Sequence, residues 1–141
     1  MPAEGLERFV AAQAGRHDAA LAEIRRGRKA GHWMWWVFPQ VAGLGRSGTA
    51  RRYAIRDMAE AEAYLAHPVL GARLVEAAEA MLPHAGTPPE AILGGIDALK
   101  LRSSMTLFAH VPGAPEVFRE VLRAFYGGEE DPQTTVRIGS R

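Results

Sequence analysis

Apolar residues recur at every third or fourth position along most of the chain, which is the period of an α-helix rather than the alternation of a β-strand. The clearest stripe lies near the C-terminus, where Phe118, Val121, Leu122 and Phe125 occupy positions i, i+3, i+4 and i+7. Helical spacing, together with the stop signals between segments, predicts helices over residues 6–14, 18–26, 50–55, 57–66, 68–82, 88–93, 96–108 and 115–126. The 96–108 segment is expected to be amphipathic, with Ile96 and Leu99 among its packing residues.

Several polar residues mark where these helices should begin and end. Asp57 precedes Glu60 by three positions, the spacing of a capping box, and Thr87 precedes Glu90 in the same way. Gly127-Gly128 is a typical stop signal for the last clear helix. We therefore predict a mainly α fold, a single compact domain of about six to eight helices with at most one or two short strands. The domain is expected to span residues 1–128, followed by a polar C-terminal tail over residues 129–141.

One short apolar run, residues 33–38, does not reveal its own conformation. Its length and aromatic content suit a short strand, but the same run fits a buried helical turn, and Pro39 stops it in either case. Most of its tryptophan surface is expected to lie in the core. Neighbouring residues of a strand point to opposite faces, so in a strand Trp35 or Trp36 would reach a surface and offer a stacking platform.

The composition narrows the class of protein. The 141 residues correspond to about one domain, and 48% hydrophobic with 23% charged residues is ordinary for a globular protein. The absence of cysteine excludes a disulfide scaffold, a thiolate zinc site and a cysteine nucleophile. No apolar run approaches the length of a membrane span, and the first residues do not read as a signal peptide. We therefore expect a cytoplasmic protein.

The net charge of +1 conceals an uneven distribution. No acidic residue occurs between Arg25 and Arg56, a stretch that contains eight lysines and arginines and all three tryptophans. Such a segment suits an anionic ligand that stacks on aromatic rings, although charged runs are more often the solvated faces of helices. The charge disfavours nucleic-acid binding, because the rest of the chain balances this basic stretch.

Gly43-Leu44-Gly45-Arg46-Ser47-Gly48 matches the G-x-G-x-x-G pattern of dinucleotide-binding folds. The surrounding sequence does not alternate strands with helices as that fold requires. A simpler hypothesis is that the loop seats an anion on its backbone N–H groups, with help from Arg46 or a neighbouring arginine. The alternative is a surface loop without a bound ligand, whose glycines only permit its turns.

A polar group interrupts the apolar pattern of the 96–108 segment. Asp97, Lys100 and Ser103 are spaced at i and i+3, and Ser104 follows. They suit phosphate binding or acid–base chemistry, or else an ion pair that fixes helix packing. The five histidines show no metal-ligand spacing, so we expect no metal site.

The chain resembles the DUF1810 family of uncharacterised bacterial proteins over roughly residues 6–128. The strings that carry the resemblance are Asp18–Ile24, the Gly-Arg-Lys of residues 27–29, His32–Gln40, Leu44–Ser47, Ala63–Gly71 and Asp97–Phe108. The resemblance implies a mainly α-helical protein and brings no established activity. A weaker, distant likeness is to the NADAR family, which acts on metabolites related to ADP-ribose and riboflavin. That likeness loosely aligns Lys100 with the family's lysine and Glu60 or Glu62 with its glutamate.

These observations favour a small-molecule site for a phosphorylated ligand derived from a nucleotide or ribose, which the protein binds or hydrolyses. Asp97 and Lys100 are the candidate catalytic residues. The candidate ligand-binding residues are His32, Trp33, Trp35, Trp36, Gln40, Arg46, Ser47, Ser103 and Ser104. No cofactor is implied. The alternative is a protein–protein interaction or homodimer module, in which the tryptophans and basic residues form a docking surface.

Overall fold

The computed structural model describes residues 5–139, which form ten α-helices and one 3₁₀ turn. The elements are α1 (Glu7–Gln13), α2 (His17–Arg25), α3 (Met34–Val37), α4 (Gly48–Arg52), α5 (Met58–Ala66), α6 (Leu70–Met81), η2 (Leu82–His84), α7 (Pro89–Leu93), α8 (Gly95–Ala109), α9 (Val117–Tyr126) and α10 (Pro132–Arg137). The predicted mainly α class is confirmed. The helix number slightly exceeds six to eight, because four of the helices have only four to six residues.

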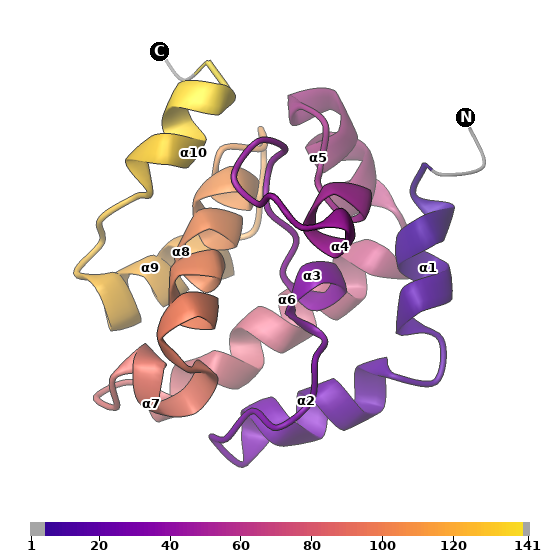
Figure 1. Cartoon of the computed structure of the whole chain (residues 1–141). Helices are drawn as coiled ribbons and strands as arrows, with labels where there is room; N and C mark the ends of the chain where they lie inside the picture. Colours follow the sequence, from indigo (N-terminus) through magenta and orange to yellow (C-terminus); the bar gives the residue numbers. More distant parts are fainter. Residues whose placement is uncertain (1–4, 140–141) are drawn as a thin grey trace.

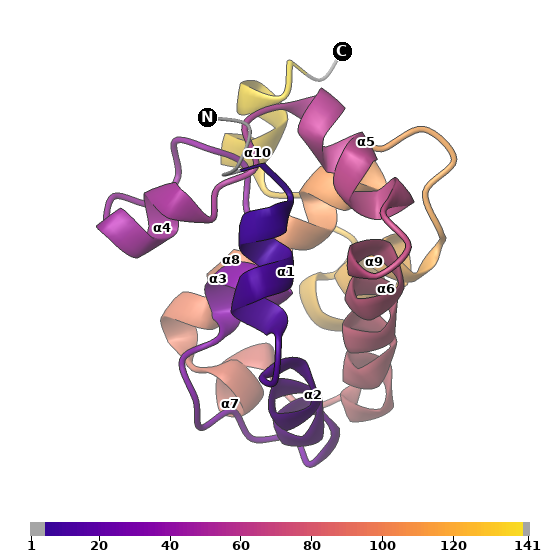
Figure 2. The ribbon, with the colours of Figure 1, turned by 90° about the vertical axis from the view of Figure 1, so that its right-hand side faces the viewer.

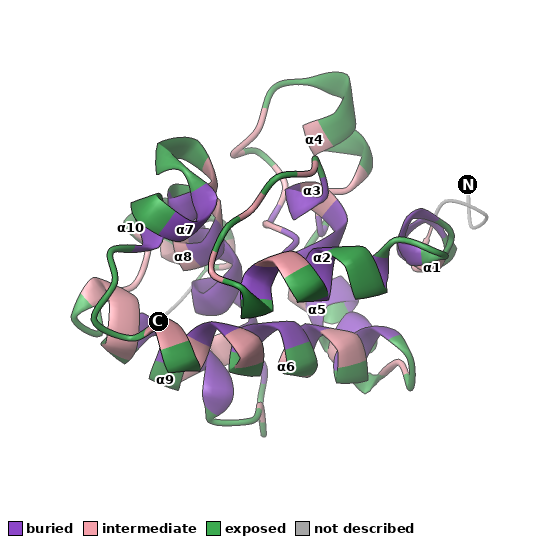
Figure 3. Cartoon of the chain, turned by 90° about the horizontal axis from the view of Figure 1, so that it is seen from below, coloured by how far each residue is buried: buried purple, intermediate pink, exposed green. Residues whose placement is uncertain are grey.

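Two long helices organise the molecule, α6 and α8 (Figure 1). α8 packs against α5, α7, α9 and α10, whereas α6 packs against α2, α5 and α9. Seen from below, α2, α6 and α9 each carry buried residues on one side and exposed residues on the other (Figure 3). These one-sided helices enclose a single core, in which Tyr64, Phe108 and Phe118 make successive aromatic contacts.

The short apolar run is a helical turn, α3, and not a strand. Successive helical residues point about 100° apart, so Trp36 is buried while Trp35 is only half-buried. The only bridge between extended residues in the described part of the chain pairs Val41 with Ile55. There the N–H of Ile55 donates to the Gln40 carbonyl at 2.8 Å, which ties the end of this turn to the segment before α5.

The helix boundaries follow the sequence signals closely but not everywhere. The Asp57 side chain accepts a hydrogen bond from the Glu60 N–H at 2.9 Å, so the predicted cap of α5 is confirmed. Gly127 ends α9 in the left-handed conformation. The Thr87 signature is wrong as a cap, because Pro88 is the N-cap of α7 and no side chain bonds its first turn.

The expected amphipathic pattern of α8 is wrong in its first turns. Ile96 and Leu99 are 73% and 64% exposed, so they do not pack inward as the spacing suggests. From Leu101 onward the helix is almost entirely enclosed, because α5, α9 and α10 surround it. α8 therefore changes from a half-exposed helix at its N-terminus to a core helix, and two apolar side chains remain at the surface.

The segment after α9 is attached to α8 by polar contacts. Asp131 caps α10 and its carboxylate accepts hydrogen bonds from Ser103 at 2.9 Å and Thr134 at 2.6 Å. Further along α10, Arg137 donates to the carbonyl of Gly43 at 3.0 Å. The chain end thus reaches the glycine-containing loop that precedes α4.

Candidate functional site

A cavity of about 400 Å³ lies where the loop before α3 meets the start of α8. Its volume falls within the range of about 300–1,000 Å³ that is typical of small-molecule sites. The residues that line it are Lys29, His32, Met34, Trp35, Leu93, Gly94, Gly95, Ile96 and Asp97. We call it the Trp35 cavity. It combines the tryptophan run with the Asp97 group, two features that the sequence left unconnected.

Charged side chains beside this cavity form a linked group. The Nζ atom of Lys29 lies 2.9 Å from Asp97 Oδ2 and also donates to the Gly31 carbonyl at 2.6 Å. Lys100 Nζ lies 3.6 Å from the other oxygen, Asp97 Oδ1. The three side chains are 11%, 17% and 22% exposed for Lys29, Asp97 and Lys100. Asp97 thus positions Lys29 firmly, while its longer contact leaves the donors of Lys100 available.

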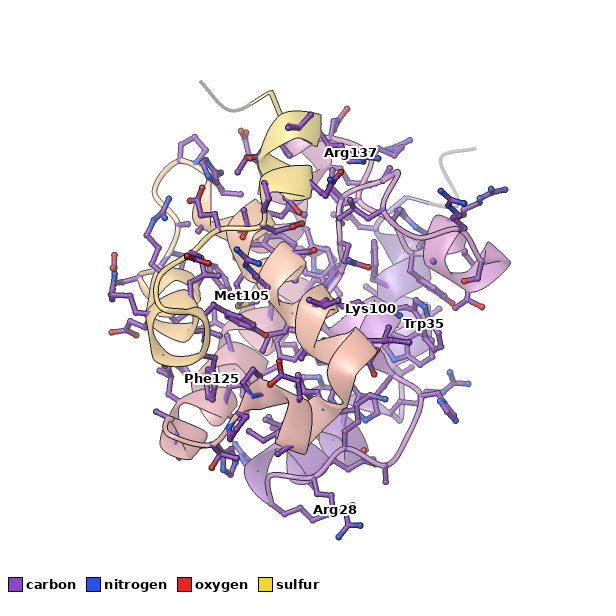
Figure 4. The ribbon with its side chains drawn as sticks, turned by 60° about the vertical axis from the view of Figure 1, so that its left-hand side comes forward. Arg28, Trp35, Lys100, Met105, Phe125 and Arg137 are labelled. Atoms are coloured by element: carbon purple, nitrogen blue, oxygen red, sulfur yellow. The ribbon has the colours of Figure 1, made fainter. Side chains whose placement is uncertain are left out.

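The indole of Trp35 lies next to the Lys100 ammonium. Lys100 Nζ is 5.0 Å from the centroid of the ring, within the range of a cation–π contact (Figure 4). On the α3 side, the Trp36 ring contacts Trp35 with centroids 5.9 Å apart. Trp35 is therefore held between its neighbour and a cation, and it contributes part of the cavity wall.

Glu23 of α2 holds the loop that carries Lys29 and His32. One carboxylate oxygen, Oε1, accepts hydrogen bonds from the N–H groups of Ala30 and Gly31 at 2.7 and 2.9 Å and from the Trp33 indole at 2.8 Å. Burial raises the pKa of Glu23, but these donors and the charge of Arg26 outweigh it, so its pKa lies below its ordinary value. The loop conformation at the cavity therefore depends on an ionised Glu23.

We expect the protein to lose stability as the pH falls below about 4.5. The carboxyl groups of Glu23, Glu60 and Glu130 all have a pKa below the ordinary 4.5 in the folded protein. A carboxyl group whose pKa is lower in the folded than in the unfolded protein stabilises the fold at any pH above its unfolded-state pKa. This stabilisation is lost as the pH falls through the folded-state pKa. The loss of stability is measured by the urea midpoints of unfolding between pH 7 and pH 3. A Glu23→Gln variant should be less stable at pH 7 and less sensitive to acid, whereas a wild-type midpoint that stays flat from pH 5 to pH 3 would contradict the argument.

A second, very small cavity lies on the other side of Trp35. It has about 10 Å³ of space, roughly that of one water molecule, and Trp35, Gln40 and Lys100 are among its lining residues. Trp35 and Met34 line both cavities and separate them. Gln40 therefore lies close to Lys100, but it faces a space too small for an organic ligand.

The other two tryptophans are placed behind the cavity. Trp33 is buried, with its indole N–H on Glu23 and the Lys29 ammonium 5.3 Å from its ring centroid. Trp36 is also buried, and its carbonyl accepts a hydrogen bond from the Gln13 side chain at 2.7 Å. Both rings support the loop and α3 instead of lining the Trp35 cavity.

The glycine-rich motif forms an exposed loop outside the cavity. Ser47 accepts a hydrogen bond from the Ala50 N–H at 3.0 Å and caps α4, and Arg46 is exposed. A Cβ atom on Gly45 would lie 2.5 Å from the Ala50 Cβ, so this glycine permits a tight turn. The turn geometry thus accounts for Gly45, and neither Arg46 nor Ser47 lines the Trp35 cavity.

Neither of the two serines of α8 lines the Trp35 cavity. Ser103 bonds Asp131, as described above, and helps to attach α10. Ser104 is fully buried, and its hydroxyl oxygen has no hydrogen-bond partner among the described residues. Of the sequence-predicted residues, the structure therefore brings together His32, Trp35, Asp97 and Lys100, with Gln40 at the edge, and leaves the two serines elsewhere.

Two residues of the site were not among the sequence candidates. Lys29 pairs with Asp97, and Glu23 holds the loop that carries Lys29. Both lie within the sequence strings that carry the DUF1810 resemblance, and that resemblance is the signal that could have identified them as site residues. Helical spacing assigned Lys29 only to a helix end, and no local pattern links it to α8.

Glu60, one of the two loosely aligned glutamates, forms ion pairs within the fold and does not line the Trp35 cavity. Its carboxylate pairs with Arg8 and Arg56 at 3.2 Å each, and it accepts the Arg56 N–H at 2.9 Å. Glu62, the other loosely aligned glutamate, lies on α5 and does not line the Trp35 cavity.

The described residues form neither a metal-binding cluster nor a membrane-spanning helix. Residues 5–139 contain no group of three or more His, Asp or Glu side chains arranged to hold a metal ion. Over the same range, no helix combines the length and apolar character needed to cross a membrane.

The comparisons with known proteins place the chain among uncharacterised proteins. The family model described as "Protein of unknown function (DUF1810)" matches residues 3–138. The structure is similar to the crystal structure of the conserved hypothetical protein Rv1873 from Mycobacterium tuberculosis, with a TM-score of 0.93 and 47% sequence identity. The alignment covers 96% of this chain and 97% of that one. No curated protein matches the sequence significantly.

Proposed function

The chain belongs to the DUF1810 family, whose function is unknown, and we propose that it binds a small phosphorylated molecule of the nucleotide or ribose phosphate class in the Trp35 cavity. The observation that carries the proposal is that an indole ring, a lysine and a carboxylate line one cavity of suitable volume, with the Lys100 ammonium against the same indole and the same carboxylate. An aromatic face accepts a base or a sugar, and ammonium groups accept a phosphate.

The charge at the cavity favours an anion. Lys29 in the cavity lining and Lys100 beside it, on the other oxygen of Asp97, carry two positive charges against this single carboxylate, and the lining contains no other acidic residue. The three side chains are largely buried, and in such an environment charges interact more strongly than they do in bulk water. Lys100 is the residue we expect to contact the phosphate, because only one long contact engages its ammonium.

Trp35 and Asp97 would recognise the rest of the ligand. The indole offers stacking surface beside Lys100, as in Figure 4, and a phosphate on Lys100 would place an attached sugar or base close to it. Each oxygen of Asp97 already contacts one lysine but retains a second lone pair, which can accept a hydrogen bond from a ribose hydroxyl. If a bound phosphoester is hydrolysed, Asp97 is the carboxylate placed to act as general base.

A thermal-shift screen tests the proposal. The panel contains ADP-ribose, NAD, flavin mononucleotide, nucleoside monophosphates, ribose 5-phosphate and inorganic phosphate. A ligand at about 100 times its Kd adds about 2.7 kcal/mol, which is a shift of several degrees in a domain of this size. We expect at least one compound to shift the Tm of the wild type and not that of a folded Trp35→Ala variant.

The matched control removes an aromatic ring from another face. Phe125 on α9 is half-buried and lies well away from Trp35 (Figure 4), so Phe125→Ala should keep the ligand shift. No shift with any phosphorylated compound would overturn the proposal. Equal loss of the shift in both alanine variants would attribute the effect to stability and would overturn it too. Phosphate release measured on the same panel reports hydrolysis.

The second candidate function is a protein–protein or homodimer interface. The exposed side chains of Ile96 and Leu99 favour it, because two large apolar residues lie at the surface within one turn of α8. Sedimentation of the wild type and of a Leu99→Asp variant, which leaves the lining of the Trp35 cavity unchanged, separates the two functions. A wild-type dimer that the variant dissociates supports the interface, whereas two monomers with an intact ligand shift support the cavity.

A further inference from the structure

A second and larger hollow lies between α5, α6 and the loop that joins α8 to α9. Its volume is about 850 Å³, and it shares no residue with the Trp35 cavity. Figure 2 shows these three segments on one side of the molecule, with α3 and α4 on the other. The hollow is therefore a separate feature that the proposed function does not use.

The chemistry of this hollow is apolar with an acidic border. Leu65, Val75 and Val111 contribute apolar side chains, and Glu62, Glu76 and Glu79 contribute carboxylates. None of the twelve lining residues is a lysine, arginine or histidine. We call it the acidic groove. Its charge is opposite to that of the Trp35 cavity.

Two of the three carboxylates are not neutralised by the described residues. Glu76 lies 3.2 Å from His17 and 3.7 Å from Arg25. Within residues 5–139, Glu62 and Glu79 make no ion pair, and both are exposed. A cationic partner would therefore find two free carboxylates, one on α5 and one on α6.

The groove is elongated along α6. It follows this helix from Gly71 to Glu79, which is about 12 Å at a rise of about 1.5 Å per residue. A Cβ atom on Gly71 would collide with the carbonyl of Leu65, so the glycine lets α5 cross close to α6 at this end. The opposite wall is the loop of Val111, Pro112, Gly113 and Pro115. An apolar trough about two helical turns long suits a short helix with apolar anchors at i, i+3 or i+4, and i+7.

We propose that the acidic groove binds a basic amphipathic helix of a partner protein. Apolar side chains of that helix contact Leu65, Val75 and Val111, and its lysines or arginines pair with Glu62 and Glu79. Charge complementarity selects the partner, because the lining carries the two free carboxylates of Glu62 and Glu79 and no positive charge. The proposal is independent of the ligand in the Trp35 cavity.

Fluorescence anisotropy with a synthetic probe tests this inference. The probe is a labelled 14-residue peptide of leucine and lysine, with leucine at helical spacing. A second peptide has glutamate in place of lysine. We expect saturable binding of the lysine peptide alone, at least about tenfold weaker in a Glu62→Lys/Glu79→Lys variant, because both attractions become repulsions. A Val75→Ser variant, which keeps every charge, should also weaken binding.

A charge-matched variant keeps the test specific. Glu7→Lys/Glu90→Lys makes the same change in net charge on α1 and α7, away from the groove, and should bind the lysine peptide almost as well as the wild type. Equal weakening in both lysine variants would show general charge attraction and overturn the proposal. So would NMR amide shifts on the titrated protein that lie outside α5, α6 and residues 111–115. Peptide-independent dimerisation through the groove, measured by light scattering, would assign it to a second copy instead.

Discussion

Replacing Glu60 with alanine is expected to lower the free energy of unfolding by about 3–5 kcal/mol, which is typical when one partner of a buried ion pair is removed. Glu60 and Arg8 are both buried, and the guanidinium makes two contacts to the carboxylate at 3.2 and 3.3 Å. Without Glu60, the buried guanidinium of Arg8 would lose both of these contacts to a carboxylate. The N–H of Arg56 would lose its acceptor as well.

The same carboxylate connects three parts of the chain. Arg8 also donates to the carbonyls of Arg52 and Ala54, each at 2.6 Å, so the pair joins α1 to the segment between α4 and α5. Burial raises the pKa of Glu60, but the hydrogen bonds and charges of Arg8 and Arg56 outweigh it, and the pKa lies below its ordinary value. Glu60 is thus an ionised residue that holds α1 against the rest of the fold.

Urea unfolding at pH 7 measures this effect. The midpoint should fall while the slope stays close to that of the wild type. Glu62→Ala, two positions further along α5, removes an exposed carboxylate and should change stability by no more than about 0.5 kcal/mol. A loss below about 1 kcal/mol in Glu60→Ala would show that other groups compensate Arg8, contrary to the argument.

Replacing Lys100 with methionine is expected to weaken binding of the phosphorylated ligand by about 10- to 100-fold. A hydrogen bond to a charged group contributes about 1.5–3 kcal/mol, which corresponds to that range. Methionine keeps a long apolar side chain beside the Trp35 ring, so the change removes the charge with little loss of packing. The free energy of unfolding should change little, because Lys100 makes one contact to Asp97, at 3.6 Å.

Calorimetric titration with the compound that gives the largest thermal shift measures this loss. Arg28→Met is the matched control, since Arg28 is exposed and points away from Lys100 and Trp35 (Figure 4). It removes the same charge from the molecule without touching the cavity. Equal weakening by both substitutions would mean that only the overall charge attracts the ligand. Unchanged affinity in Lys100→Met would remove this lysine from the site.

Part of the candidate site could be predicted from the sequence because it depends on local spacing. Asp97 and Lys100 lie three residues apart on one helix, so their ion pair follows from the helical period. Trp35 was a candidate because two successive tryptophans of a strand point to opposite faces; the run is a helical turn instead, and Trp35 is still the less buried of the two. Ser103 shares the same spacing with Lys100, yet it bonds Asp131, because α10 packs against that part of α8.

The sequence by itself determined the mainly α class, most helix positions and the cap of α5 by Asp57, because each depends on residues within one or two helical turns. Only the tertiary structure decided that α3 is helical, that Ile96 and Leu99 remain exposed, and that Lys29 pairs with Asp97. Those outcomes depend on which elements pack together. No local period in the sequence records the contacts between distant segments, and these contacts create both the Trp35 cavity and the acidic groove.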